Sequence, residues 1–128
     1  MAAAERVDAP LDARNLRRLA ERSFAGMARV GASFSNGSGD YAIAFSTAEP
    51  VRSPASSRSA TSGGPVLRND RMSPLFTAVA EATEAAIVDS LFRADAVTGR
   101  DGHRAPALPI DAVLDVLRRA GVVPATGR

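Results

Sequence analysis

The sequence contains no cysteine, no tryptophan and no lysine, and its only histidine is His103. Without cysteine there is no disulfide framework, no thiol nucleophile and no thiolate metal site. A single histidine cannot form a histidine-rich metal cluster, and a Ser-His-Asp triad would have to use it. His103 follows a glycine-rich stretch and lies beside Asp101 and Arg104, so we expect a surface residue and not a catalytic base. We therefore expect no metal and no other cofactor.

An excess of charge of one sign is also missing, since 16 arginines face 14 acidic residues and the formal net charge is +2. The arginines are scattered, whereas a nucleic-acid binder usually concentrates its positive charge on one face with aromatics among it. No stretch is long and apolar enough to span a bilayer, and the first residues lack the apolar core of a signal peptide. We expect a cytoplasmic protein that binds neither nucleic acid nor membrane.

The length of 128 residues suits one domain or part of one. Hydrophobic residues make up 45% of the chain but aromatics only 5%, so small side chains, mostly alanine, must do much of the packing. We therefore expect the elements of the fold to approach one another closely. We treat residues 1–128 as a single partial domain.

Periodicity predicts a long helix over residues 11–30, with Asp12 at its start and Gly31 at its end. Its expected apolar stripe is Leu16, Leu19, Ala20, Phe24, Met27 and Ala28. Residues 41–47 alternate as a strand does, and both faces lack charge, which predicts a central strand buried on both sides. Residues 1–9 are ambiguous, because Glu5 and Arg6 interrupt a weak strand pattern.

A second long helix is expected to begin at Ser73-Pro74, and a short C-terminal helix to end at Gly121. The expected buried face of the second helix is Phe76, Val79, Ala80, Thr83, Ile87, Leu91 and Phe92. Between the strand and this helix, residues 49–66 are rich in Ser, Pro and Gly and have no apolar period. We expect them to form a mobile loop.

The stretch Asn36-Gly37-Ser38-Gly39-Asp40 carries the most chemical information. Its glycines are expected to allow a tight turn, which presents Ser38 and Asp40 side by side before the strand. A hydroxyl and a carboxylate held in this way can receive a proton, orient a nucleophile or bind an ammonium group. The competing interpretation is a polar turn that only introduces the strand.

Several motifs in this order resemble the β-subunit of the L-aminopeptidase/D-esterase family, which includes the β-peptidyl aminopeptidases. The motifs are Asp8-Ala9-Pro10-Leu11, Leu16-Arg17-Arg18-Leu19-Ala20, Asn36-Gly37-Ser38-Gly39-Asp40, Ala44-Phe45-Ser46-Thr47-Ala48, Arg68-Asn69-Asp70-Arg71, Pro74-Leu75-Phe76, Glu81-Ala82-Thr83-Glu84-Ala85-Ala86-Ile87 and Thr98-Gly99-Arg100-Asp101-Gly102. The resemblance covers nearly all of the chain except residues 1–7 and 49–66.

The resemblance implies an α/β fold, as part of a four-layer α/β/β/α sandwich. It also implies a precursor that cuts itself into an α and a β piece and exposes an N-terminal serine as nucleophile. The α-amine of that serine can act as its base. Such enzymes release N-terminal residues from small peptides, amides or esters, so the implied partners are a small substrate and a further chain or copy.

By the same resemblance, Ser38 and Asp40 are the catalytic-site residues that contact the nucleophile. Counted back from Ser38, however, the family nucleophile falls just before the first residue, and no Ser, Thr or Cys precedes Ser23. We therefore expect the isolated chain to be inactive. Three interpretations stay open: a fragment of a peptidase precursor, a decayed gene product or separate non-catalytic subunit, and a helical interaction module without activity.

Overall fold

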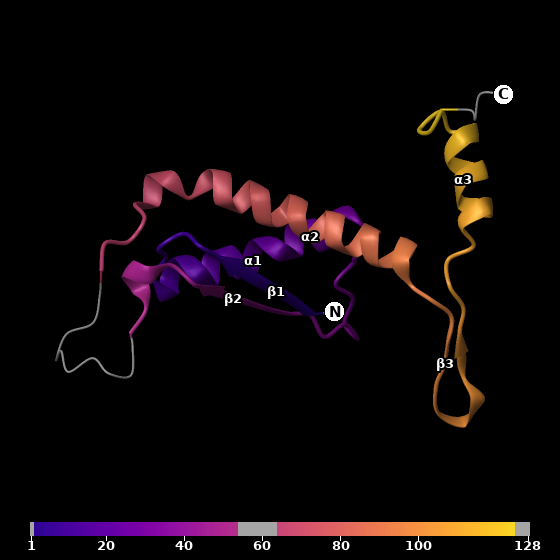
Figure 1. Ribbon diagram of the computed structural model, residues 1–128, viewed down its shortest axis with the longest axis horizontal. Helices are drawn as coiled ribbons and strands as arrows, with labels where there is room; N and C mark the ends of the chain where they lie inside the picture. Colours follow the sequence, from indigo (N-terminus) through magenta and orange to yellow (C-terminus); the bar gives the residue numbers. More distant parts are fainter. Residues whose placement is uncertain (1, 54–63, 125–128) are drawn as a thin grey trace. The chain divides into compact units, whose positions relative to one another are not determined.

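The computed structural model describes residues 2–53 and 64–124, which form two compact units, 1–86 and 87–128 (Figure 1). The boundary between the units falls inside the second long helix, and each unit is described by itself. The expectation of a single partial domain stays a prediction. In the described ranges, no helix is both long and apolar enough to cross a membrane.

The first unit is built on a strand–helix–strand motif. It consists of β1 (Ala2–Val7), α1 (Ala13–Arg29) and β2 (Tyr41–Ser46). The two strands are parallel, and their register runs from Ala2 opposite Tyr41 to Val7 opposite Ser46. A helix is the usual way to return the chain between parallel strands. The expected helix and strand are confirmed, and the ambiguous first residues form β1.

Local chemistry sets both ends of α1. The Asp12 carboxylate accepts a hydrogen bond of 2.7 Å from the backbone N–H of Asn15, which caps the first turn. At the other end Gly31 has φ +97°, and the Ala32 N–H donates to the Met27 carbonyl oxygen at 3.1 Å. Both expected boundary signals of this helix are therefore confirmed.

The second long helix, α2 (Ser73–Arg93), packs against α1, and its N-terminal part belongs to the first unit. The two helices come close at Gly26, where a Cβ atom would lie 2.4 Å from the Ala80 carbonyl oxygen and 2.7 Å from Thr83 Cβ. The expected close approach through small residues is confirmed here. The apolar core cluster beside this seam consists of Leu11, Leu19, Met72 and Val79.

The buried face of α1 differs from the expected stripe. Leu19, Ala20 and Met27 are buried as expected, but Ala28 is exposed. Small or polar residues complete the buried face instead: Asn15, Ser23 and Gly26. They can be buried because Ser23 satisfies its hydroxyl within the helix, through a 2.7 Å hydrogen bond to the Ala20 carbonyl oxygen.

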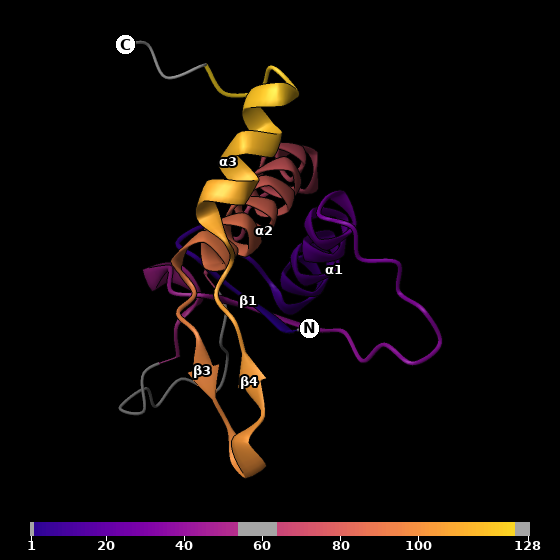
Figure 2. The ribbon, with the colours of Figure 1, turned by 90° about the vertical axis from the view of Figure 1, so that its right-hand side faces the viewer.

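The expected burial of β2 on both faces is wrong for the described chain. Ala42, Ala44 and Ser46 face the helices, but Tyr41, Ile43 and Phe45 on the other face are 73%, 63% and 45% exposed. Within the described residues β2 pairs with β1 alone, so it is not a central strand of this sheet. The physical reason is that both helices lie on the same side of the two strands (Figures 1 and 2).

The second unit contains a short hairpin and a helix. Its elements are β3 (Val97–Thr98), β4 (Arg104–Ala105), which is antiparallel to β3, and α3 (Ile110–Arg119). His103 is exposed, and Gly121 ends α3 with φ +70°, as expected. Leu91 and Phe92 near the end of α2 are 52% and 41% exposed, so their expected burial is wrong.

The remaining turns are short 3-10 segments, at Glu49–Val51, Asn69–Arg71 and Arg100–Gly102. Of the loop expected over 49–66, residues 54–63 lie outside the described residues.

Candidate active site

Ser38 and Asp40 lie together in the loop that connects α1 to β2. The Ser38 hydroxyl donates a short hydrogen bond to Oδ2 of Asp40. The Ser38 backbone N–H donates to the Ser35 carbonyl oxygen at 2.8 Å, which fixes the turn that presents the hydroxyl. Ser38 is exposed and Asp40 is half-buried. The structure thus brings together the two residues that the sequence singled out.

Charge and hydrogen bonding favour the ionised form of Asp40. The hydrogen bond from Ser38 is the main cause that holds the pKa of the Asp40 carboxyl below its ordinary value of 3.8. A hydrogen bond donated to a carboxylate stabilises the charged form. At neutral pH Asp40 is therefore an anion that can pair with an ammonium group.

An open hollow of about 450 Å³ lies beside this pair. Its lining residues are Phe24, Phe34, Ser38 and Asp40. The two aromatic rings meet edge to face, with their centroids 6.0 Å apart and their planes at 75°. The lining of the hollow therefore combines aromatic rings with a hydroxyl and a carboxylate, a combination that suits an amine with an apolar substituent.

Sequence reasoning missed Phe34 and placed Phe24 only in a core stripe. Phe34 adopts a left-handed backbone conformation, with φ +48°. The expected tight turn is confirmed, because Asn36 and Gly37 lie in a turn that the Ser38 N–H closes on the Ser35 carbonyl oxygen, although neither Gly37 nor Gly39 has a positive φ. The uncommon backbone conformation occurs instead at an aromatic residue, and no composition signal distinguishes that position.

The register of the two parallel strands places the start of β1 at this site. Ala2 lies opposite Tyr41, the residue that directly follows Asp40. Because neighbouring strands are about 4.8 Å apart, the first residue of β1 lies next to the start of β2, which directly follows the Ser38–Asp40 pair. The two strands run side by side from this common edge (Figure 1).

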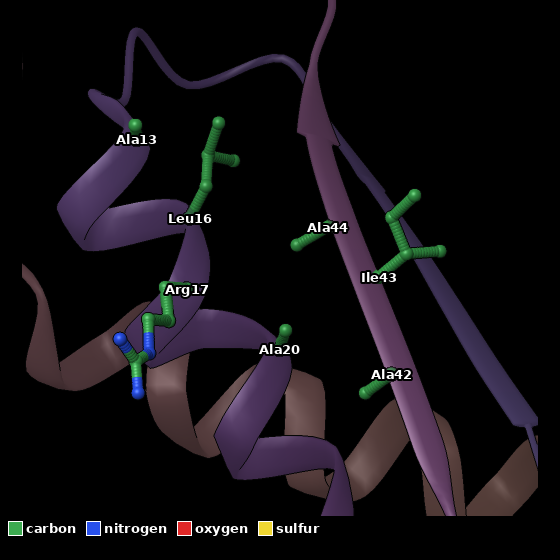
Figure 3. A pocket seen from close by; sticks show the side chains of 7 residues that line it. All are labelled: Ala13, Leu16, Arg17, Ala20, Ala42, Ile43 and Ala44. Carbon is green, nitrogen blue, oxygen red and sulfur yellow. The ribbon is translucent and has the colours of Figure 1, made fainter.

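A second hollow, of about 350 Å³, lies between α1 and β2 (Figure 3). Leu16 and Ala20 of the helix face Ala42 and Ala44 of the strand, and Ile43 points to the other side of the sheet. This lining offers a packing surface and little chemistry. Over the described ranges, no group of three or more His, Asp and Glu side chains could hold a metal ion.

Comparison with known proteins identifies the class to which this fold belongs, since a solved relative has a variant of the Ntn-hydrolase fold. The model of peptidase family S58 matches residues 4–105. The chain belongs to this family.

Individual relatives agree with that assignment. The β-peptidyl aminopeptidase BapA of Sphingosinicella microcystinivorans is 41% identical over 120 residues, which are 88% of this chain and 28% of that protein. The β-aminopeptidase of a Burkholderia species is 40% identical, with a TM-score of 0.75 over 91% of this chain and 34% of that one.

A third relative is the L-aminopeptidase D-Ala-esterase/amidase of Ochrobactrum anthropi, described as a prototype of the serine aminopeptidases and a variant of the Ntn-hydrolase fold. It is 29% identical, with a TM-score of 0.76 over 90% of this chain and 33% of that one. This chain therefore spans about a third of the length of these relatives.

Proposed function

We propose that these 128 residues form the β part of a serine aminopeptidase, in which Ser38 and Asp40 contact an N-terminal nucleophile. The observation that carries the proposal is the parallel register, which brings the start of β1 beside the Ser38–Asp40 pair. The proposed reaction releases the N-terminal residue from small peptides, amides or esters. The nucleophile is a serine that directly precedes the first residue of these 128 after self-cleavage of a precursor.

The direction of the Ser38 hydrogen bond suggests a role for each residue. A hydroxyl has one proton and two acceptor lone pairs, and the Ser38 proton is donated to Asp40. The lone pairs of Ser38 are left to accept from the nucleophile's O–H or from an ammonium group. Asp40 then supplies the negative charge that stabilises the ammonium form of an amine at this site.

In the proposed acylation step the nucleophile's oxygen attacks the substrate carbonyl carbon while its own α-amine takes the hydroxyl proton. The tetrahedral intermediate collapses as the leaving amine receives that proton, and an ester links substrate and enzyme. Water then hydrolyses the ester and regenerates the serine. The role assigned to Ser38 and Asp40 is to orient the hydroxyl and to stabilise the positive charge on the amine.

The exposed apolar face of β2 supports a partner layer. Tyr41, Ile43 and Phe45 occupy every second position of β2 and so share one face. Apolar residues are arranged in this way on the inner faces of two stacked sheets. We propose that an α piece from the remaining two thirds of the protein supplies the second sheet of a four-layer α/β/β/α sandwich.

We also propose that the protein is located in the cytoplasm. The alternative of a non-catalytic helical module is not favoured by the comparisons.

The proposal is tested in the complete precursor, in which these residues follow their α piece and a junction serine. Asp40→Asn keeps the size of the side chain but cannot pair with an ammonium. Losing one partner of a desolvated charge pair costs on the order of 2–5 kcal/mol, so kcat/KM should fall about 30- to several-thousand-fold. Ser38→Ala removes one neutral hydrogen bond and should cost about 2- to 10-fold.

Ser35→Ala is the matched control, because it removes a hydroxyl from the same loop but leaves the Ser38 hydroxyl and the Asp40 carboxylate in place. It should keep kcat/KM within about twofold, as is usual for a surface substitution. If Asp40→Asn and Ser38→Ala also kept the wild-type value, the loop would be a structural turn and the proposal would be wrong. The 128 residues alone should show no turnover of aminoacyl p-nitroanilides or esters.

A further inference from the structure

A second cluster of polar groups lies on the part of α1 that is not used by the candidate active site. Arg14, Arg18 and Arg22 follow one another at four-residue steps, so they share one side of the helix. We call these three residues the arginine row. Asn69, in the 3-10 turn before α2, faces two of them: its Oδ1 atom accepts from Arg14 Nη2 at 3.0 Å and also from Arg18.

The other neighbour of the arginine row is an aromatic ring of α2. The guanidinium carbon atoms of Arg18 and Arg22 lie 4.9 Å and 4.8 Å from the centre of the Phe76 ring. Arg18 also donates to the Asn15 side-chain oxygen at 3.0 Å. An amide and a ring therefore hold these guanidinium groups in place, and neither neutralises their charge.

Other arginines of α1 are paired with carboxylates, unlike the arginine row. Arg17 pairs with Glu21 at 3.1 Å, and Arg29 pairs with Glu84 at 3.1 Å. By contrast, no carboxylate of the described residues forms an ion pair with a member of the arginine row. Like charges at four-residue steps repel each other, so a row that is held by neutral groups is a preorganised positive site.

We propose that the arginine row binds a phosphate-type oxyanion from solution, such as inorganic phosphate or pyrophosphate. Guanidinium forks match the oxygen geometry of phosphate, and an anion with more than one negative charge can neutralise several arginines at once. Arg14 and Arg22 are exposed and Arg18 is half-buried, so the cluster is accessible. The bound anion would tie α1 to the turn that begins α2, because Asn69 and Phe76 belong to that region.

The test is calorimetric titration of the 128-residue protein with pyrophosphate and with phosphate, at constant ionic strength maintained with sodium chloride. We expect saturable binding that weakens about tenfold or more in Arg22→Gln, since one charge-assisted interaction is lost. Arg22 is the first choice of variant, because its side chain is exposed and its removal leaves the Asn69 hydrogen bonds of Arg14 and Arg18 in place. Arg18→Gln should have the larger effect.

Arg17→Gln is the matched control, since it removes the same charge from the same helix but from a side chain that is already paired with Glu21. The affinity of this variant for pyrophosphate and phosphate should stay within about twofold of that of the wild type. The proposal is overturned if no saturable binding occurs, if Arg17→Gln and Arg22→Gln weaken binding equally, or if acetate at the same concentration competes as well as phosphate. None of these outcomes depends on peptidase activity, so the proposed function can fail separately.

Discussion

At the scale of single residues, the hydrogen bond between Ser38 and Asp40 has a pH-dependent consequence. The bond lowers the pKa of the Asp40 carboxyl in the folded chain, so its contribution to stability is present above the unfolded pKa and is lost as pH falls through the folded pKa. We predict that the Asp40 carboxyl carbon titrates below 3.8 by NMR, and that Ser38→Ala moves the midpoint upward.

Ser35→Ala provides the comparison for this titration, because it changes the same loop and leaves the Ser38 donor in place. Its Asp40 midpoint should match that of the wild type. An unchanged midpoint in Ser38→Ala would show that the hydroxyl does not hold the carboxylate in solution.

Residue-level chemistry was predictable from sequence where it depends on local spacing. Ser38 and Asp40 are two positions apart before a strand, and the structure joins them. Phe34 could not be predicted, because its place in the hollow depends on a ring contact with Phe24 and on a left-handed backbone that aromatic residues rarely adopt. Sequence patterns carry no information about either.

At the scale of elements, the seam between α1 and α2 depends on the absence of a side chain at Gly26. We predict that Gly26→Ala destabilises the protein by about 1–3 kcal/mol, because the new methyl group would meet the α2 backbone at Ala80. This clash outweighs the roughly 0.5–1 kcal/mol that alanine normally gains over glycine inside a helix. Chemical denaturation of both proteins measures the difference.

Gly37→Ala is the control for that measurement, since a Cβ atom there would meet nothing within 4 Å and the backbone φ is not positive. Its stability should stay within about 0.5 kcal/mol of the wild type. A neutral or stabilising Gly26→Ala would mean that the helices are farther apart than the structure shows.

The elements themselves follow from periodicity and end signals, which are local properties of the chain. Asp12 and Gly31 set the ends of α1, and alternation located β2 to within one residue. Whether both faces of β2 are buried could not be predicted from the sequence. An apolar face such as that of Ile43 indicates that some segment should bury it, but the pattern does not identify that segment.

At the scale of the whole molecule, a sheet of two strands with one apolar face open to solvent is marginally stable. We predict that the 128-residue chain self-associates or requires a partner chain. Sedimentation should give a mass above the 13.3 kDa of one chain, and Ile43→Asp should reduce self-association because it places a charge on the open face.

Ala85→Asp, which adds the same charge at an exposed position of α2, is the control and should leave the mass unchanged. A monomer that unfolds sharply at micromolar concentration would contradict the prediction and would count against a missing second sheet.

The in-register pairing of β1 with β2 makes the number of residues in β1 as important as their identity. Glu5 reaches the Thr83 hydroxyl at 3.1 Å because it is the fourth residue of the strand. Deleting one residue before it would turn every side chain upstream of the deletion to the opposite face of the sheet. The same deletion would withdraw the start of the strand by about 3.3 Å from Asp40. Most single substitutions in β1 would leave that spacing intact. The length of β1 therefore sets how far its first residue lies from the loop that carries Asp40.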